Sequence, residues 1–126
     1  MAAEFLSPLM TEDLEDTSGG RWKLLSPLCY YSEYLASIGA DPNIIVPIGF
    51  ITDFASVPRV PIIFEVFGDI CHKAPTVHDF LYTTKPVARE HADKVLREAS
   101  IISGIPEWKS ELMYLAVHEF GGNHWN

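Results

Sequence analysis

The stretch from Ala74 to Tyr82 contains the residue types best suited to chemistry, because a histidine and an aspartate are adjacent there. Read as a helix, it places Ala74, His78 and Tyr82 on one face and turns Asp79 about 100° around the axis. A histidine on such a face acts as a general base near neutral pH when a carboxylate orients its ring and some water is excluded. Because Asp79 points away, the orienting acid must come from another element.

Asp93 is the best candidate for the orienting acid. A short turn around Pro86 returns the next helix antiparallel to the first and brings Asp93 back towards His78. Asp79 could in turn reach a metal ion or a water molecule beside the histidine. A plainer interpretation stays open, in which Arg89 and Asp93 form a surface ion pair worth well under about 1 kcal/mol and His78 is a satisfied core residue.

Two other constellations are formally available. A zinc site could use three histidines and an acid, namely His72, His78, His91 and Asp53. Their spacing matches no zinc-binding signature. Ser56 could serve in a Ser-His-Asp triad, but the Gly-x-Ser-x-Gly turn that exposes such a serine does not occur in the sequence.

The composition indicates a single folded domain with an acidic surface. The chain has 126 residues, 48% of them hydrophobic, which is enough for one core and argues against disorder. Its net charge of −8 argues against binding to nucleic acid, which needs clustered Lys and Arg, and against electrostatic adhesion to anionic membranes. We therefore expect no nucleic-acid partner.

Neither a disulfide scaffold nor a membrane anchor is expected. The two cysteines, Cys29 and Cys71, are too few for such a scaffold, so we expect buried free thiols. Residues 1–10 contain no Lys or Arg and do not resemble a secretory signal. The longest apolar run, 44–51, contains a proline and a glycine and is too short to span a membrane. We therefore predict no transmembrane segment and synthesis in the cytosol.

The first half of the chain predicts a small antiparallel sheet. Strands are expected at 5–6, at 22–31 with Pro27 marking an edge or a bulge, and at 44–47 with a continuation over 48–53 after a bend. Prolines at 58 and 61 exclude regular helix from the stiff loop that follows.

The second half predicts three packed helices, at about 75–83, 87–103 and 106–120. The middle helix has an apolar stripe that runs from Ala88 to Ile102, and the last helix is expected to be the most buried. The predicted fold class is therefore α+β, in a single domain over 1–126. The sheet and proline-rich loop occupy about 1–60, and the helices occupy about 74–121.

Three motifs occur along the chain in a specific combination. They are Val46-Pro47-x-Gly49-Phe50-x-Thr52-Asp53-x-Ala55-Ser56-Val57-Pro58-Arg59, His78-Asp79-x-Leu81-Tyr82 and Arg89-x-x-Ala92-Asp93. Together they closely resemble a family of small phage and prophage proteins catalogued as domain of unknown function 1353. The resemblance implies a protein of the tail or late genes, made in the bacterial host cytoplasm and associated with the virion. Its implied partners are other phage structural proteins, in a homo- or hetero-oligomer within the particle.

A shorter segment, His78-Asp79-x-x-Tyr82 followed by Ala92-Asp93, resembles the core of phospholipase A2. By that resemblance His78 is the base that activates water, and Tyr82 and Asp93 hold its ring. Asp79 is then the ligand of a calcium ion. The implied substrate is an ester or amide of the cell envelope, in lipid or cell wall.

The calcium site of phospholipase A2 is only partly matched. Its glycine-rich calcium loop and its disulfides have no counterpart in this sequence. Calcium takes several oxygen ligands, so the others would come from Thr52 and Asp53 in the loop that leaves the sheet.

Three functions remain open from the sequence. One is a metal-assisted hydrolase delivered by the phage. Another is a non-enzymatic structural or tail-assembly protein, in which the same polar cluster locks the fold. The third is an acidic inhibitor of a host factor, whose surface mimics nucleic acid.

Overall fold

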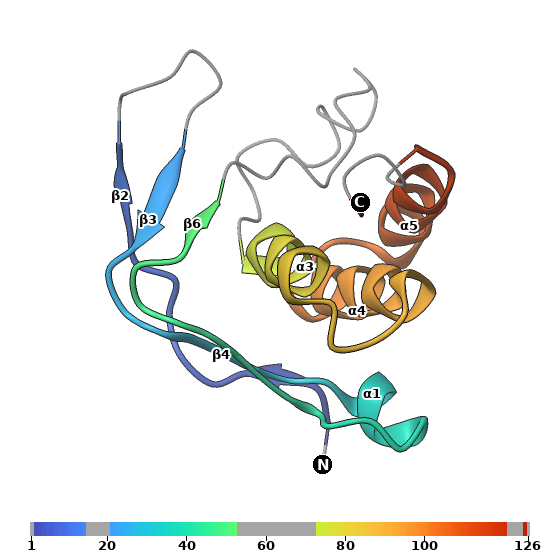
Figure 1. Ribbon diagram of the computed structural model, residues 1–126. Helices are drawn as coiled ribbons and strands as arrows, with labels where there is room; N and C mark the ends of the chain where they lie inside the picture. Colours follow the sequence, from blue (N-terminus) through green and yellow to red (C-terminus); the bar gives the residue numbers. More distant parts are fainter. Residues whose placement is uncertain (1, 15–20, 53–72, 121–124, 126) are drawn as a thin grey trace.

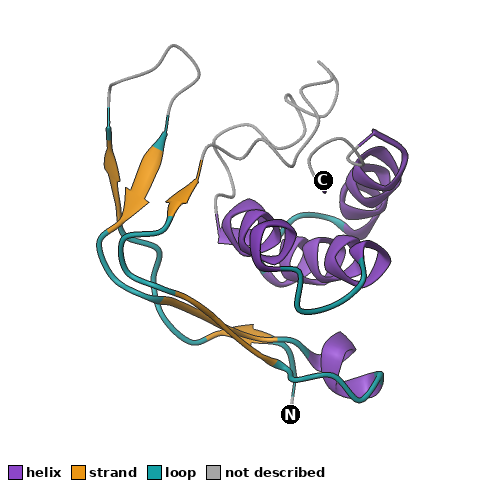
Figure 2. Ribbon diagram, viewed as in Figure 1, coloured by secondary structure: helices purple, strands orange, loops and turns teal. Residues whose placement is uncertain are grey.

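The computed structural model describes residues 2–14, 21–52, 73–120 and 125 (Figure 1, Figure 2). Its described strands and one short helix lie within residues 4–52, and three long helices lie within residues 73–120. The strands are β1 Glu4–Phe5, β2 Thr11–Asp13, β3 Trp22–Leu24, β4 Leu28–Tyr31, β5 Asn43–Val46 and β6 Ile51–Thr52. The helices are α1 Glu33–Ser37, α3 Lys73–Thr84, α4 Arg89–Ile102 and α5 Glu107–Phe120. The predicted α+β class is confirmed.

The described strands form two three-stranded antiparallel sheets, in the orders β1-β4-β5 and β2-β3-β6. One register runs through both sheets, because Leu28 faces Val46 in the first and Trp22 faces Thr52 in the second at the same offset. The pairing of β1 with β4 continues in the same way into that of β2 with β3. The two sheets are therefore successive parts of one bent ribbon, with residues 21–31 in the middle.

A row of prolines divides this ribbon. The common register places Pro8, Pro27 and Pro47 at one level, one on each of the three chain segments. Proline has no N–H and cannot continue the ladder, so all three segments are interrupted together. Ser7 bridges the interruption, since its hydroxyl donates to the carbonyl of Pro27 (3.1 Å) and accepts from the N–H of Cys29 (2.8 Å).

The expectation of one small sheet, with Pro27 marking an edge or a bulge, is confirmed as to antiparallel strands but differs in detail. Pro27 lies in the middle segment, between β3 and β4, and the ladder is divided into two sheets at its level. One proline would remove a single backbone donor and leave a local defect. Three prolines at one level remove the backbone donor of all three segments at that position, so the ladder of hydrogen bonds is interrupted there.

α3 is the middle layer of the protein. It packs against β4, β5 and β6 on one side and against α4 on the other (Figure 1). Its apolar side chains are almost fully buried, among them Ala74, Val77 and Leu81. Being covered from two sides is what makes this helix the most buried of those described.

The prediction that the last helix is the most buried is wrong. Trp108 is 64% exposed and Leu115 is 52% exposed. Among the described elements, α5 packs against α4 at the outside of the helical layer, and one face of α5 is buried by this contact. That face carries Met113 and Val117, both fully buried.

Turn residues fix the helix ends close to the predicted positions. Lys85 (φ 52°) and Gly104 (φ 97°) adopt left-handed backbone conformations after α3 and α4. The N–H of Gly104 donates to the carbonyl of Ile101 (3.0 Å), which closes α4. Ala88 and Ile102, predicted on the buried stripe of α4, are exposed because they lie at its two ends.

Glu98 ties α4 to the strand layer. Its carboxylate accepts hydrogen bonds from the hydroxyls of Tyr30 and Ser32 (2.8 Å each) and from the N–H of Tyr34 (2.7 Å). Ser32 also caps α1, since its hydroxyl oxygen accepts from the N–H of Leu35 (3.1 Å). One carboxylate thus holds β4, the start of α1 and α4 together.

Two smaller predictions concern the state of the cysteines and the absence of a transmembrane segment. Cys29 is a free thiol as expected, but it is half-buried rather than buried, and Cys71 lies outside the described residues. Among the described residues, no helix combines the length and the apolar character needed to cross a membrane.

Candidate functional site

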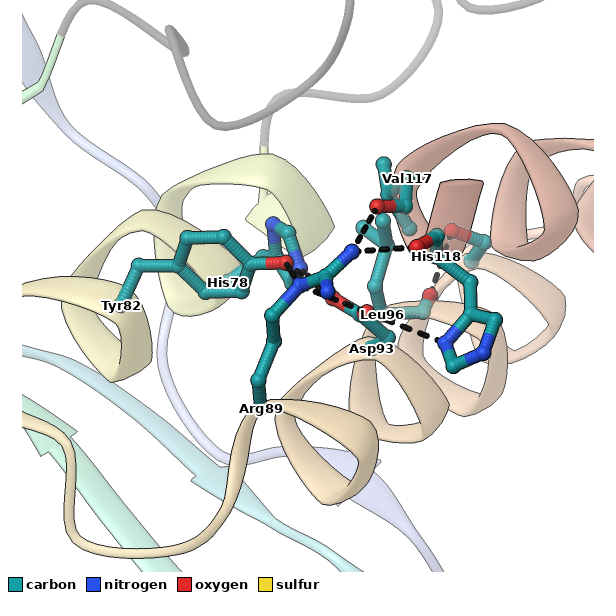
Figure 3. A network of polar contacts seen from close by, with 8 residues as sticks. His78, Tyr82, Arg89, Asp93, Leu96, Val117 and His118 are labelled. Atoms are coloured by element: carbon teal, nitrogen blue, oxygen red, sulfur yellow. Dashed lines mark hydrogen bonds and ion pairs between the residues drawn. The ribbon is translucent and has the colours of Figure 1, made fainter. Parts of the chain in front are cut away.

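α3 and α4 bring His78, Tyr82 and Asp93 into contact (Figure 3). His78 Nε2 lies 2.8 Å from Asp93 Oδ1, and the hydroxyl of Tyr82 donates to the same oxygen at 2.5 Å. All three side chains are buried, His78 and Asp93 completely. The predicted geometry, an inward histidine met by the acid of the next helix, is therefore confirmed.

The local sequence explains this arrangement. His78 and Tyr82 are four residues apart on α3, so they project from one face, and their rings lie 4.3 Å apart between centroids. The turn at Lys85 reverses the chain, and α4 then runs back along α3 with Asp93 facing them. Nε2 of His78 and Oδ1 of Asp93 form a hydrogen bond, and with an ionised carboxylate as the acceptor the ring hydrogen lies on Nε2.

The plainer interpretation of Arg89 and Asp93 as a surface ion pair is wrong. Asp93 is completely buried, and Arg89 Nε lies 3.8 Å from its Oδ2. The guanidinium reaches inward instead, where its Nε donates to the hydroxyl of Tyr82 at 3.3 Å. The complete burial of His78 agrees with the interpretation of this residue as part of the core.

His118 also lies close to the carboxylate of Asp93, a contact that the sequence does not predict. Its Nδ1 lies 3.8 Å from Asp93 Oδ2, and its ring stacks on Tyr114 with centroids 5.6 Å apart. The side chain is half exposed, unlike that of His78. Only the packing of α5 on α4 brings it here, and no motif in the sequence signals that contact.

The predicted metal ligands are placed in part. Thr52, at the end of β6, donates its hydroxyl hydrogen to Asp79 Oδ2 at 2.7 Å, so these two residues meet beside α3. Asp53 lies outside the described residues, as do Ser56 and His72 from the alternative constellations.

The zinc hypothesis gains no support from the described histidines. The ring of His91 pairs with the hydroxyl of Tyr34 through Nδ1 (2.7 Å), whereas His78 pairs with Asp93. Within residues 2–14, 21–52, 73–120 and 125, no three His, Cys, Asp or Glu side chains gather closely enough to hold a metal ion.

Fold and site together describe an α+β domain with a buried His-Asp-Tyr centre between two antiparallel helices. The chain belongs to the family described as protein of unknown function (DUF1353), whose model matches residues 22–117. The match runs from the start of β3 into the last turn of α5 and includes the whole centre. A search of curated proteins and a search of solved structures find no significant match.

We expect the folded state to lose stability above about pH 10. Burial raises the pKa of Tyr82, the hydrogen bond to Asp93 raises it further, and Arg89 opposes this only in part. Burial and the neighbouring Glu98 likewise raise the pKa of Tyr30. A tyrosine that holds its proton more tightly when folded contributes fully below its unfolded pKa and loses that contribution as the pH rises past it.

Urea denaturation of the wild type, Tyr82→Phe and Tyr30→Phe measures this effect. Each variant removes one titrating hydroxyl, so its deficit in free energy of unfolding should shrink between about pH 8 and about pH 11. A deficit that stays constant across this interval would contradict the assignment.

Proposed function

We propose that the protein is a phage-encoded hydrolase that cleaves an ester or amide of the cell envelope, with His78 as its general base. The observation that supports this is the shared oxygen of Asp93, which accepts from both His78 Nε2 and Tyr82. The hydrogen bond from Nε2 holds the imidazole in one tautomer and orientation, which a general base requires, and the hydrogen bond from Tyr82 fixes the carboxylate that accepts it.

The proposed step uses water as the nucleophile. The imidazole of His78 takes one proton from the water as the water oxygen bonds to the carbonyl carbon. The bond to the leaving group then breaks, and the leaving group receives that proton from the imidazolium. Asp93 stabilises the positive ring through its contact with Nε2, while Tyr82 keeps the carboxylate in place.

A second candidate is a structural or tail-assembly protein, and burial favours it. His78 and Asp93 are both inaccessible to solvent in this structure. A buried, hydrogen-bonded polar cluster specifies one arrangement of the helices around it, which gives it a role without any reaction. The two candidates differ in what the imidazole is needed for.

His78→Gln separates the candidates. A glutamine side chain can still donate to Asp93 but cannot act as a base, so hydrolysis should fall by at least about 100-fold. Its thermal midpoint should stay close to that of the wild type. The probes are a chromogenic short-chain ester, phosphatidylethanolamine vesicles and purified peptidoglycan.

His91→Gln is the matched control, because it changes a histidine of α4 that bonds to Tyr34 and not to Asp93. It should keep the wild-type rate. If the wild type cleaves none of the three probes while His78→Ala, which removes the donor to Asp93, lowers the free energy of unfolding by several kcal/mol, the fold-lock function stands instead.

We also propose calcium as the cofactor, with Asp79 and Thr52 among its ligands and Asp53 beyond the described residues. The donor chemistry suits a hard cation, since Asp79 offers a carboxylate and Thr52 a hydroxyl oxygen. These two residues supply only part of the set of about 6–8 oxygens that calcium takes, so we derive no step through the metal.

Calcium should raise the melting temperature of the wild type, because a ligand that binds only the folded state stabilises it by mass action. Asp79→Asn should abolish the rise. Glu90→Gln, which changes an exposed acid of α4, should retain it. An unchanged melting curve at millimolar calcium, measured by differential scanning calorimetry, would exclude this cofactor.

We propose further that the protein works in the phage particle, in the tail or in the module that brings the phage into the cell. The support is the resemblance of its three motifs to phage and prophage proteins. Mass spectrometry of virions purified on a density gradient should detect the chain alongside other structural proteins. Finding it in the host lysate and not in the virions would contradict this location.

A further inference from the structure

Arg89 connects the buried centre to the last turn of α5. Its Nε donates to the hydroxyl of Tyr82 (3.3 Å) and lies 3.8 Å from Oδ2 of Asp93. Its Nη2 donates to the carbonyl oxygens of Val117 (3.0 Å) and His118 (Figure 3). The side chain of Arg89 therefore forms hydrogen bonds both to the buried centre and to the last turn of α5.

These contacts set the direction of the hydrogen bonds at the centre. A guanidinium only donates, so the oxygen of Tyr82 accepts from Arg89 and its single hydrogen is directed to Asp93. Asp93 Oδ1 then receives one hydrogen from Tyr82 and one from His78. The order of donation runs one way, from Arg89 through Tyr82 to the carboxylate.

The second oxygen of Asp93 gives Arg89 an electrostatic role as well. Oδ2 is buried and has no hydrogen-bond partner among the described residues. Arg89 Nε lies 3.8 Å away, as does Nδ1 of the half-exposed His118. At that distance the guanidinium acts on the carboxylate through its charge, without competing for the oxygen that holds His78.

The contacts to α5 make this placement dependent on that helix. The last carbonyls of an α-helix have no partner within the helix, and Val117 and His118 lie in the last turn of α5. Arg89 satisfies both of them with one nitrogen. A movement of α5 would therefore shift the guanidinium and, with it, the donor to Tyr82.

We propose that Arg89 is the positioning residue of the His78–Asp93 pair. It directs the hydroxyl of Tyr82, balances the charge of the buried carboxylate and transmits the position of α5 to the imidazole. The proposal rests on the proposed function for its catalytic consequence only, because the geometry of the pair can be measured without a substrate.

Arg97 provides a matched control on the same helix. It also bridges α4 to α5, through Glu111 (2.5 Å) and Glu107 (3.3 Å). Its exposure of 32% is close to the 28% of Arg89. Arg97 differs in having no contact with the centre, so it separates a positioning role from simple attachment of α5.

Nuclear magnetic resonance of protein labelled with ¹⁵N at histidine tests the proposal. The hydrogen on Nε2 of His78 is buried and bonded to Asp93, so it should exchange slowly and give its own downfield resonance in the wild type. Arg89→Gln should broaden or abolish this resonance. Arg97→Gln should leave it at the wild-type position, although both variants lose a bridge between α4 and α5.

Arg89→Lys and Arg97→Lys repeat the comparison with the charge kept, so the test does not depend on the folding of the glutamine variants. A lysine cannot reach the hydroxyl and both carbonyls at once, so Arg89→Lys should restore the resonance only in part. The proposal is overturned if the Arg89 and Arg97 variants affect the resonance equally, or if the Arg89 variants leave it unchanged.

Activity then tests the catalytic consequence separately. With any probe that the wild type hydrolyses, Arg89→Gln should lower kcat with little change in KM, whereas Arg97→Gln should change neither. If no probe is hydrolysed, the proposed function fails while the resonance still decides whether Arg89 positions the imidazole.

Discussion

The burial of the Asp93 carboxylate is the constraint on which the helical layer depends. A carboxylate removed from water is costly unless hydrogen bonds and opposite charge replace the lost hydration. α3 supplies two donors to Oδ1, and α4 supplies the guanidinium of Arg89. α5 contributes the carbonyl oxygens of Val117 and His118, which accept hydrogen bonds from that guanidinium. Displacing any of the three helices would strip the carboxylate of a partner.

The strand ribbon wraps this layer and is attached to it near both ends. The row of prolines divides the ribbon into two sheets, each with its own contact to the helices. In one sheet Thr52 of β6 donates to Asp79 of α3, and beside the other Glu98 of α4 accepts from Tyr30 and Ser32 (Figure 1). Carboxylates on the helices thus accept hydrogen bonds from hydroxyls in or beside the strands. These polar contacts, together with the apolar core, fix how the strands lie against the helices.

The same contacts serve a hydrolase and a fold lock equally well. A general base needs an imidazole held in one tautomer, and a lock needs a buried donor that has no alternative partner. The hydrogen bond from His78 to Asp93 serves either role. The two roles differ in whether the imidazole takes a proton, which is why a variant that keeps the donor and removes the base separates them.

The sequence by itself determined whatever depends on local periodicity. The helical repeat places His78 and Tyr82 on one face, and a short turn brings Asp93 back to them, so the centre was predictable from α3 and α4 alone. Contacts between elements distant in sequence were decided by the tertiary structure. The level shared by the three prolines follows from strand register, and the inward reach of Arg89 and the approach of His118 follow from how α5 lies on α4. Helical periodicity specifies which face of a helix is apolar, whereas packing specifies what that face meets.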